Sequence, residues 1–112
     1  MTVVPFAPFR FSPADLAEFY EIAVPKCTQG LWAGVMRQTG GDYDRLMVSL
    51  KGVARPVFSF ERGQDGRYRL FYHDRLERRL IGLGDSAAEC LVIWRTRRER
   101  IGARRRPVER AV

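Results

Sequence analysis

The chain has 112 residues, 46% of them hydrophobic and 29% charged, a composition that predicts one folded domain and excludes a disordered chain. No hydrophobic run reaches the roughly 20 residues of a membrane-spanning helix, and the N-terminus lacks the pattern of a signal peptide, so we expect a cytoplasmic protein. The formal net charge is +7, and residues 95–112 carry most of it, with eight arginines and two glutamates. We therefore predict a single globular domain over residues 1–94, which hold twelve basic and eleven acidic side chains, and a basic C-terminal extension over residues 95–112.

Residues 1–11 are predicted to form an extended arm. Pro5 and Pro8 exclude a helix there. Three phenylalanines give the arm apolar side chains to bury: Phe6, Phe9 and Phe11. Such an arm either lies across its own domain, where it can pair as an edge strand, or binds a partner chain.

A helix is predicted to begin after Ser12. Ser12 can cap it, Pro13 suits its first position, and Asp15 lies three residues after the cap, near the positive end of the helix dipole. Hydrophobic residues then recur at helical spacing and predict one apolar face: Leu16, Phe19, Tyr20 and Ala23. Pro25 is expected to end the helix, because proline disfavours the helical conformation of the residue before it.

Two strands are predicted next, over residues 31–38 and 46–51, with a turn at residues 40–42. Both faces of the first strand are apolar, with Trp32 and Met36 on one of them, which favours a central position in a sheet. The second strand alternates between hydrophobic and more polar residues, as expected for a strand with one buried face.

A β-hairpin over residues 56–73 is the clearest element of the sequence. A two-residue turn would mix hydrophobic and polar side chains on each face, whereas a three-residue loop with Gly66 at positive φ separates them. The pairs predicted by this register are Phe58 with Tyr72, Phe60 with Leu70, and Glu61 with Arg69. One face is then aromatic, and we interpret it as core rather than as a surface for stacking nucleic-acid bases.

Residues 74–84 fit either a short helix or a strand, and we predict a strand because it extends the antiparallel meander and closes at two glycines. Asp85 to Glu89 then predict a second capping box and a helix that runs past Trp94 into the arginines. The predicted fold class is α+β: an N-terminal helix, a four- to five-stranded antiparallel sheet, and a C-terminal helix running into the arginine-rich tail. Both helices are expected on one face of the sheet.

The order helix, antiparallel strands, helix is similar to that of double-stranded-RNA-binding domains, and Gly82 and Gly84 stand where such a domain turns from its last strand into its final helix. That family places lysines at the start of this helix, where they bind phosphate. This chain has Asp85 and Glu89 there, and carboxylates repel phosphate. We therefore assign the chain to no family.

The sequence carries no catalytic, cofactor or metal motif, and we expect a protein that is not an enzyme and holds no cofactor. Cys27 and Cys90 are predicted to be free core thiols, and together with His73 they are too few for a structural zinc site. His73 is expected to be structural or merely exposed. Asp42 and Asp44 are interpreted as turn residues rather than as an acid–base pair.

The arginine-rich extension is the candidate functional site. Guanidinium groups bind phosphates in pairs of hydrogen bonds and release counterions, so the cluster predicts contacts with RNA or DNA. The candidate residues are Arg95, Arg97, Arg98, Arg100, Arg104, Arg105 and Arg106. Arg67 and Arg69, on the polar face of the hairpin, are candidate auxiliary contacts. A helical projection scatters the tail arginines around the axis, which argues against a membrane-surface helix, and we expect no membrane partner.

Other interpretations remain open at this point. The extension can instead bind an acidic protein surface. It can also have no specific role, because arginine outnumbers lysine eighteen to two in this chain and a GC-rich bacterial genome produces the same bias. Alternatively, the domain is a protein-interaction module, for example a homodimer through a sheet edge or through the arm of residues 1–11.

Overall fold

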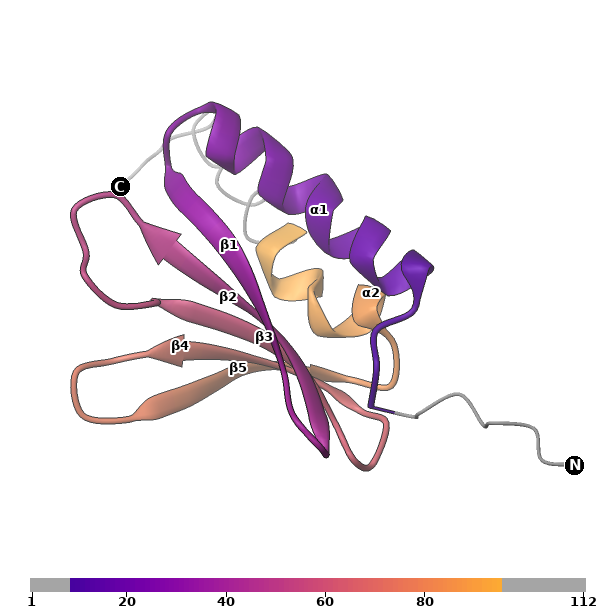
Figure 1. The fold of residues 1–112 in the computed structure, drawn as a ribbon. Coiled ribbons are helices and arrows are strands. Elements are labelled where there is room, and N and C mark those ends of the chain that lie inside the picture. Colours follow the sequence, from indigo (N-terminus) through magenta and orange to yellow (C-terminus); the bar gives the residue numbers. More distant parts are fainter. Residues whose placement is uncertain (1–8, 96–112) are drawn as a thin grey trace, which may run out of the picture.

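Five strands and two helices make up residues 9–95, which are the residues that the computed structural model describes. The strands form one antiparallel sheet in sequence order: β1 (Trp32–Thr39), β2 (Tyr43–Leu50), β3 (Phe58–Gly63), β4 (Tyr68–His73) and β5 (Arg78–Gly84). Helices α1 (Pro13–Thr28) and α2 (Ala87–Cys90) lie on one face of this sheet (Figure 1). The predicted α+β class is confirmed, and predictions for residues 1–8 and 96–112 lie outside the described residues.

Helix α1 begins as the sequence predicts but does not end at Pro25. Ser12 and Asp15 form the capping box, each side chain accepting a hydrogen bond from the other residue's backbone N–H. Pro25 lies inside the helix, which continues to Thr28; a proline so near the end removes only one helical hydrogen bond. The end is set instead by Gly30, whose φ of 79° completes a Schellman motif, so the prediction of a stop at Pro25 is wrong.

The central hairpin has the predicted register. Phe58 pairs with Tyr72 and Phe60 with Leu70 across β3 and β4. Gly66 has a φ of 81°, and its N–H donates to the carbonyl of Gly63 at 2.8 Å. The three-residue loop, predicted because it separates hydrophobic from polar side chains, is therefore confirmed.

Strand β1 differs from the prediction in both its faces and its place. A register shift between Trp32 and Gly34 puts Trp32 and Val35, rather than Trp32 and Met36, on the face that packs against α1. The strand is at the edge of the sheet and not in its centre. Its second apolar face has no covering layer among the described residues, since Met36 is 61% exposed.

The core is an aromatic cluster between α1 and the sheet. The ring of Phe60 stacks on Phe11 at 5.0 Å and on Phe19 at 5.4 Å, and all three side chains are buried. Trp94 closes the cluster at 5.2 Å from Trp32. The predicted burial of the aromatic hairpin face is confirmed for Phe60 and Tyr68, which are buried, but it is wrong for Tyr72, which lies near the end of β4 and is 38% exposed.

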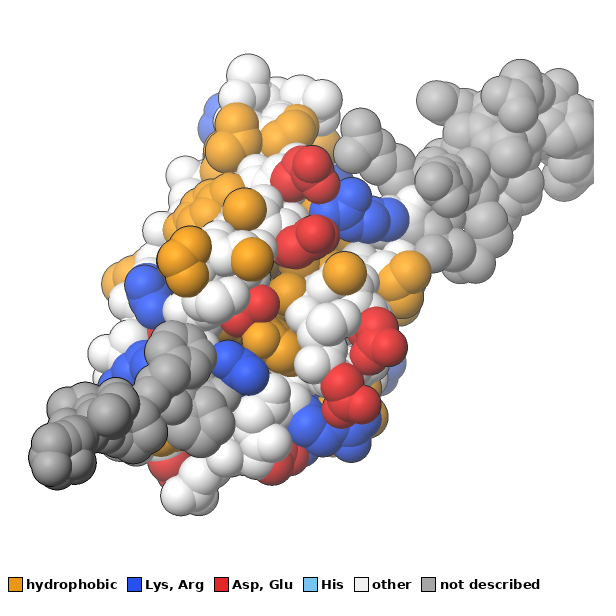
Figure 2. Space-filling model, turned by 90° about the vertical axis from the view of Figure 1, so that its right-hand side faces the viewer, with side chains coloured by type: hydrophobic (Ala, Val, Ile, Leu, Met, Phe, Trp, Pro, Cys, Tyr) orange, Lys and Arg blue, Asp and Glu red, His pale blue; other side chains and the backbone are white. Residues whose placement is uncertain are grey.

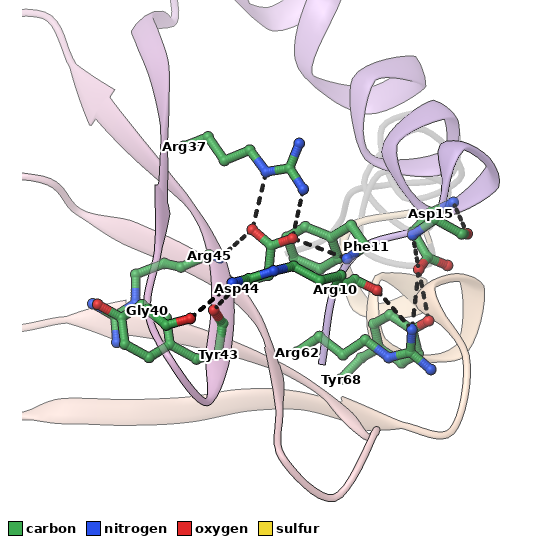
Figure 3. A network of polar contacts seen from close by, with 11 residues as sticks. Arg10, Phe11, Asp15, Arg37, Gly40, Tyr43, Asp44, Arg45, Arg62 and Tyr68 are labelled. Carbon is green, nitrogen blue, oxygen red and sulfur yellow. Dashed lines mark hydrogen bonds and ion pairs between the residues drawn. The ribbon is translucent and has the colours of Figure 1, made fainter. Parts of the chain in front are cut away.

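A polar network lies beside this core, where the chain enters α1 (Figure 3). The buried carboxylate of Asp44 accepts hydrogen bonds from the Arg37 guanidinium at 3.0 and 2.5 Å and from the Phe11 N–H at 2.9 Å. Burial alone would raise the pKa of Asp44, but these bonds outweigh it and hold the pKa below its usual value. Asp44 is therefore a buried structural carboxylate, and its interpretation as a turn residue is wrong.

The chain from β4 to α2 follows the predicted strand but not the predicted long helix. Residues 74–77 form a turn, and β5 begins at Arg78. Ser86 caps α2 by accepting from the Glu89 N–H, whereas the Glu89 carboxylate bonds the Asp85 N–H, one residue earlier than in a capping box. Helix α2 ends at Cys90, and a separate helical turn covers residues 92–95.

Both cysteines are free, in agreement with the prediction, but only Cys90 belongs to the core. Burial raises the pKa of the Cys90 thiol to about 12. Cys27 is exposed at the C-terminal end of α1, so its prediction as a core residue is wrong. Among residues 9–95, no group of three His, Cys, Asp or Glu side chains is arranged to hold a metal ion, and no helix is long and apolar enough to cross a membrane.

Candidate phosphate-binding pole

The fold brings a set of unneutralised basic side chains to one end of the sheet. Successive antiparallel strands turn at alternate ends, so the connections after β2 and after β4 lie at the same end, together with the end of α1 (left in Figure 1). We call this end the basic pole and define it by four residues: Lys26, Lys51, Arg55 and Arg75. Within residues 9–95, these four neither pair with a carboxylate nor donate to a carbonyl from their side chains.

The nine other described basic side chains are all engaged within the domain. They are Arg10, Arg37, Arg45, Arg62, Arg67, Arg69, Arg78, Arg79 and Arg95. Eight of them pair with carboxylates, and Arg10 donates to the carbonyls of Tyr43 and Gly40 at 2.7 and 3.0 Å. A guanidinium that is already hydrogen-bonded within the domain binds a phosphate more weakly, because that hydrogen bond or ion pair must first be broken. The basic pole is thus the part of the described surface with free positive charge.

A hollow of about 330 Å³ lies within the basic pole. Arg55 and Arg75 line it from the two connections, and Tyr72, which is 38% exposed, lines it from β4. The remaining lining residues are Leu50, Val53, Val57, His73 and Asp74. The Asp74 carboxylate accepts the Arg75 N–H and lies 4.0 Å from Arg79, so its charge is partly balanced. Two guanidiniums beside an exposed aromatic ring suit a phosphate next to a stacked base.

His73 lies at the edge of this hollow and is hydrogen-bonded to a buried serine. Its Nε2 lies 2.9 Å from Ser59 Oγ, and that hydroxyl donates to Glu61 at 2.9 Å, so Nε2 carries the proton given to Ser59. Burial lowers the pKa of His73, and the positive charge of Arg78 lowers it further. Ser59 is fully buried and cannot meet a substrate, so this pair is structural, as expected for the single histidine.

The structure places one of the seven predicted tail arginines. Arg95 donates to Glu18 at 3.0 Å and to Glu21 at 2.7 Å, both on α1. The other six, Arg97, Arg98, Arg100, Arg104, Arg105 and Arg106, lie outside the described residues. The chain therefore enters its arginine-rich extension from a point fixed on α1.

The two predicted auxiliary arginines lie at the opposite end of the sheet from the basic pole. Arg67 pairs with Asp85 at 2.9 Å, and Arg69 pairs with Asp65 at 2.7 Å. The bond from Arg69 holds the pKa of Asp65 at about 2. Neither arginine is brought together with the basic pole.

Contacts between rings connect the basic pole to the start of the extension. The Trp94 ring lies 5.4 Å from that of Phe58, which lies 5.8 Å from that of Tyr72 in the hollow. Sequence reasoning missed this site because Lys51, Arg55 and Arg75 are isolated residues in two different loops. Only the strand order shows that these residues come together, since alternate turns of an antiparallel meander lie at the same end of the sheet.

No protein-family model matches the chain, and no curated protein or solved structure matches it significantly.

Proposed function

We propose that this protein binds nucleic acid, without catalysis, through phosphate contacts from its C-terminal arginines and its basic pole. The observation that supports this most is the shared location of the free charges. All four basic side chains of the described domain that have no carboxylate or carbonyl partner lie at the end of the sheet where Trp94 and Arg95 lead into the extension. Residues 96–112 add seven arginines against two glutamates.

Phosphate contacts of this kind give affinity without reading the sequence. Each guanidinium that neutralises a phosphate releases a counterion, so binding weakens steeply with salt. Tyr72 adds a ring on which an unpaired base can stack, a contact worth about 1–3 kcal/mol. We therefore expect sequence-tolerant binding, with single strands favoured if Tyr72 takes part.

The test is fluorescence anisotropy with labelled single-stranded and duplex RNA and DNA over a range of salt concentrations. Replacing Arg104, Arg105 and Arg106 by Gln in the full chain should weaken binding and make the slope of log K against log salt shallower by about 0.7–0.9 for each lost contact. The double variant Arg55→Gln/Arg75→Gln should act in the same direction.

A matched control removes two arginines that are ion-paired at the far end of the sheet. The double variant Arg67→Gln/Arg69→Gln loses the same charge as the pole variant but should keep the affinity and the salt slope. Absence of binding by the full chain at low salt would contradict the proposal. Loss of binding in the tail variant alone would leave the extension as the site and refute the role of the basic pole.

A further inference from the structure

The outer edge of β1 carries few of the devices that protect a sheet edge, because its register shift is confined to the start of the strand, between Trp32 and Gly34. Strands at an edge are normally blunted by charges, prolines or bulges, because their free peptide groups can pair with another chain. The opposite edge, β5, begins with two exposed arginines, Arg78 and Arg79, and its pairing with β4 contains a register shift. Strand β1 pairs regularly with β2 from Gly34 to Thr39, and its single charge, Arg37, is bound to Asp44.

The peptide groups that face outward from β1 follow from the turn that leads to β2. The Gly40 N–H donates to the Tyr43 carbonyl at 3.0 Å, which makes these two residues a hydrogen-bonded pair. Hydrogen-bonded and non-hydrogen-bonded pairs alternate along an antiparallel ladder. The N–H and C=O groups of Val35, Arg37 and Thr39 therefore point away from β2, toward the open edge.

Exposed hydrophobic side chains of α1 run beside this edge. Val24 is 57% exposed and Tyr20 is also exposed, and a hollow of about 280 Å³ lies between α1 and β1. The hollow is lined by Tyr20, Ala23, Val24, Cys27, Thr28 and Val35. Figure 2 shows hydrophobic side chains gathered toward the upper left of the view, with basic side chains at their margin. We call this surface, with Met36 of the strand, the β1–α1 edge.

We propose that the β1–α1 edge binds a second copy of this chain, with β1 pairing antiparallel to β1 about a two-fold axis at Met36. Such an axis, perpendicular to the sheet, keeps the helices of both copies on one face and joins two five-stranded sheets into one. Val35 of each copy then lies opposite Arg37 of the other. Both residues have outward peptide groups, so they can exchange two hydrogen bonds.

The side chains of the β1–α1 edge can pack against the same side chains of the second copy. Met36 meets Met36 of the second copy, and an apolar pair at the axis is favourable. Arg37 brings no uncompensated charge, because its guanidinium is held by Asp44 of its own chain. The axis also sets the two α1 helices side by side, so that Tyr20 and Val24 of each copy can cover the hollow of the other. Among the described residues, this edge offers no free charge that a charged peptide would recognise.

Sedimentation velocity of the full chain over a range of concentrations tests the proposal. The wild type should sediment as a dimer. Met36→Lys places two positive charges against each other at the axis, and Val24→Glu places a carboxylate in the apolar contact, so each variant should be monomeric. Both side chains are exposed in the single copy, so far-UV circular dichroism should be unchanged. As a matched control, Leu83→Lys on β5, where the side chain is 44% exposed, should remain dimeric.

Three results would overturn the proposal. The first is a full-length wild type that stays monomeric at high concentration. This includes the case in which only a chain without residues 1–8 dimerises, since the arm would then cover the edge in the full chain. The second is a dimer that persists in both Met36→Lys and Val24→Glu. The third is assembly beyond a dimer, which a closed two-fold contact does not allow. Cys27 gives an independent check, because its exposed thiol should react more slowly with an alkylating reagent in the dimer than in the Met36→Lys variant.

Discussion

Replacing Asp44 by alanine should destabilise the fold by about 3 kcal/mol, because the substitution removes the acceptor on which three donors converge. The carboxylate is fully buried and bonds the Arg37 guanidinium, the Phe11 N–H at 2.9 Å and the Arg45 N–H at 3.1 Å. A buried N–H left without a partner costs about 1–3 kcal/mol, and the Phe11 N–H is buried with its residue. The Arg37 side chain is 42% exposed and can turn to water, so its ion pair contributes only about 1 kcal/mol or less.

Urea unfolding followed by tryptophan fluorescence measures this loss, since Trp32 and Trp94 both lie in the aromatic cluster. Asp42→Ala, in the exposed turn two residues earlier, is the matched control and should change the stability by less than about 0.5 kcal/mol. In a double-mutant cycle, Arg37→Ala combined with Asp44→Ala should cost less than the sum of the two, because either single variant already removes the ion pair that the two side chains share.

The pH dependence offers a separate check of the same argument. The pKa of Asp44 is lower in the folded chain than in the unfolded one, so its contribution is complete above the usual carboxyl range and is lost as the pH falls through the folded pKa. Asp44→Ala should therefore flatten the acid side of the stability profile. A variant within about 1 kcal/mol of the wild type, with an unchanged acid profile, would refute the view that this carboxylate secures the start of α1.

Three further predictions concern single side chains. Burial and a hydrogen bond to a carboxylate raise the pKa of Tyr68 to about 12. The contribution of Tyr68 to the free energy of unfolding should therefore be complete below about pH 10 and be lost as the pH rises toward 12. In urea titrations at alkaline pH, Tyr68→Phe should remove that decline. Gly82→Ala should cost about 1–3 kcal/mol in thermal unfolding, because the new Cβ would meet the Cys90 carbonyl oxygen, whereas Gly34→Ala, with open space around its Cα, should be tolerated. The pKa of His73 lies below its usual value, so the unfolded chain takes up the proton first and stability should rise with pH around the usual histidine range; His73→Gln should reduce this rise, and an unchanged profile would contradict the burial argument.

The parts of the fold that the sequence predicted well depend on residues close together along the chain. The hairpin register followed from the alternation of hydrophobic and polar residues on either side of Gly66. The start of α1 followed from Ser12 and Asp15, three residues apart, whose side chains each bond the other's backbone. In such cases the competing alternatives are few, and one local pattern decides among them.

The failures concern contacts that no local pattern reveals. Asp44 is buried because Arg37 and Phe11, 7 and 33 residues away, both reach it. The two apolar faces of β1 predict a central strand, but an exposed hydrophobic edge strand has the same sequence pattern, and β1 lies at the edge. Pro25 predicts a helix stop, whereas the Schellman motif at Gly30 determines where the helix ends. The basic pole could not be predicted without the order of the strands, because its residues lie in loops that are far apart in the sequence.

The uninterrupted strand order has a consequence for how the chain reaches its fold. Every strand pairs with its neighbour in sequence, so each new pairing closes only a short loop and costs little chain entropy. The long-range step is the meeting of α1 with the segment after β5, where Arg95 reaches Glu18 across 77 residues. We expect the sheet to assemble quickly by extension from the central hairpin, and the contact between the two ends of the domain to form last. The junction that leads into the arginines is then the slowest part of the domain to become ordered.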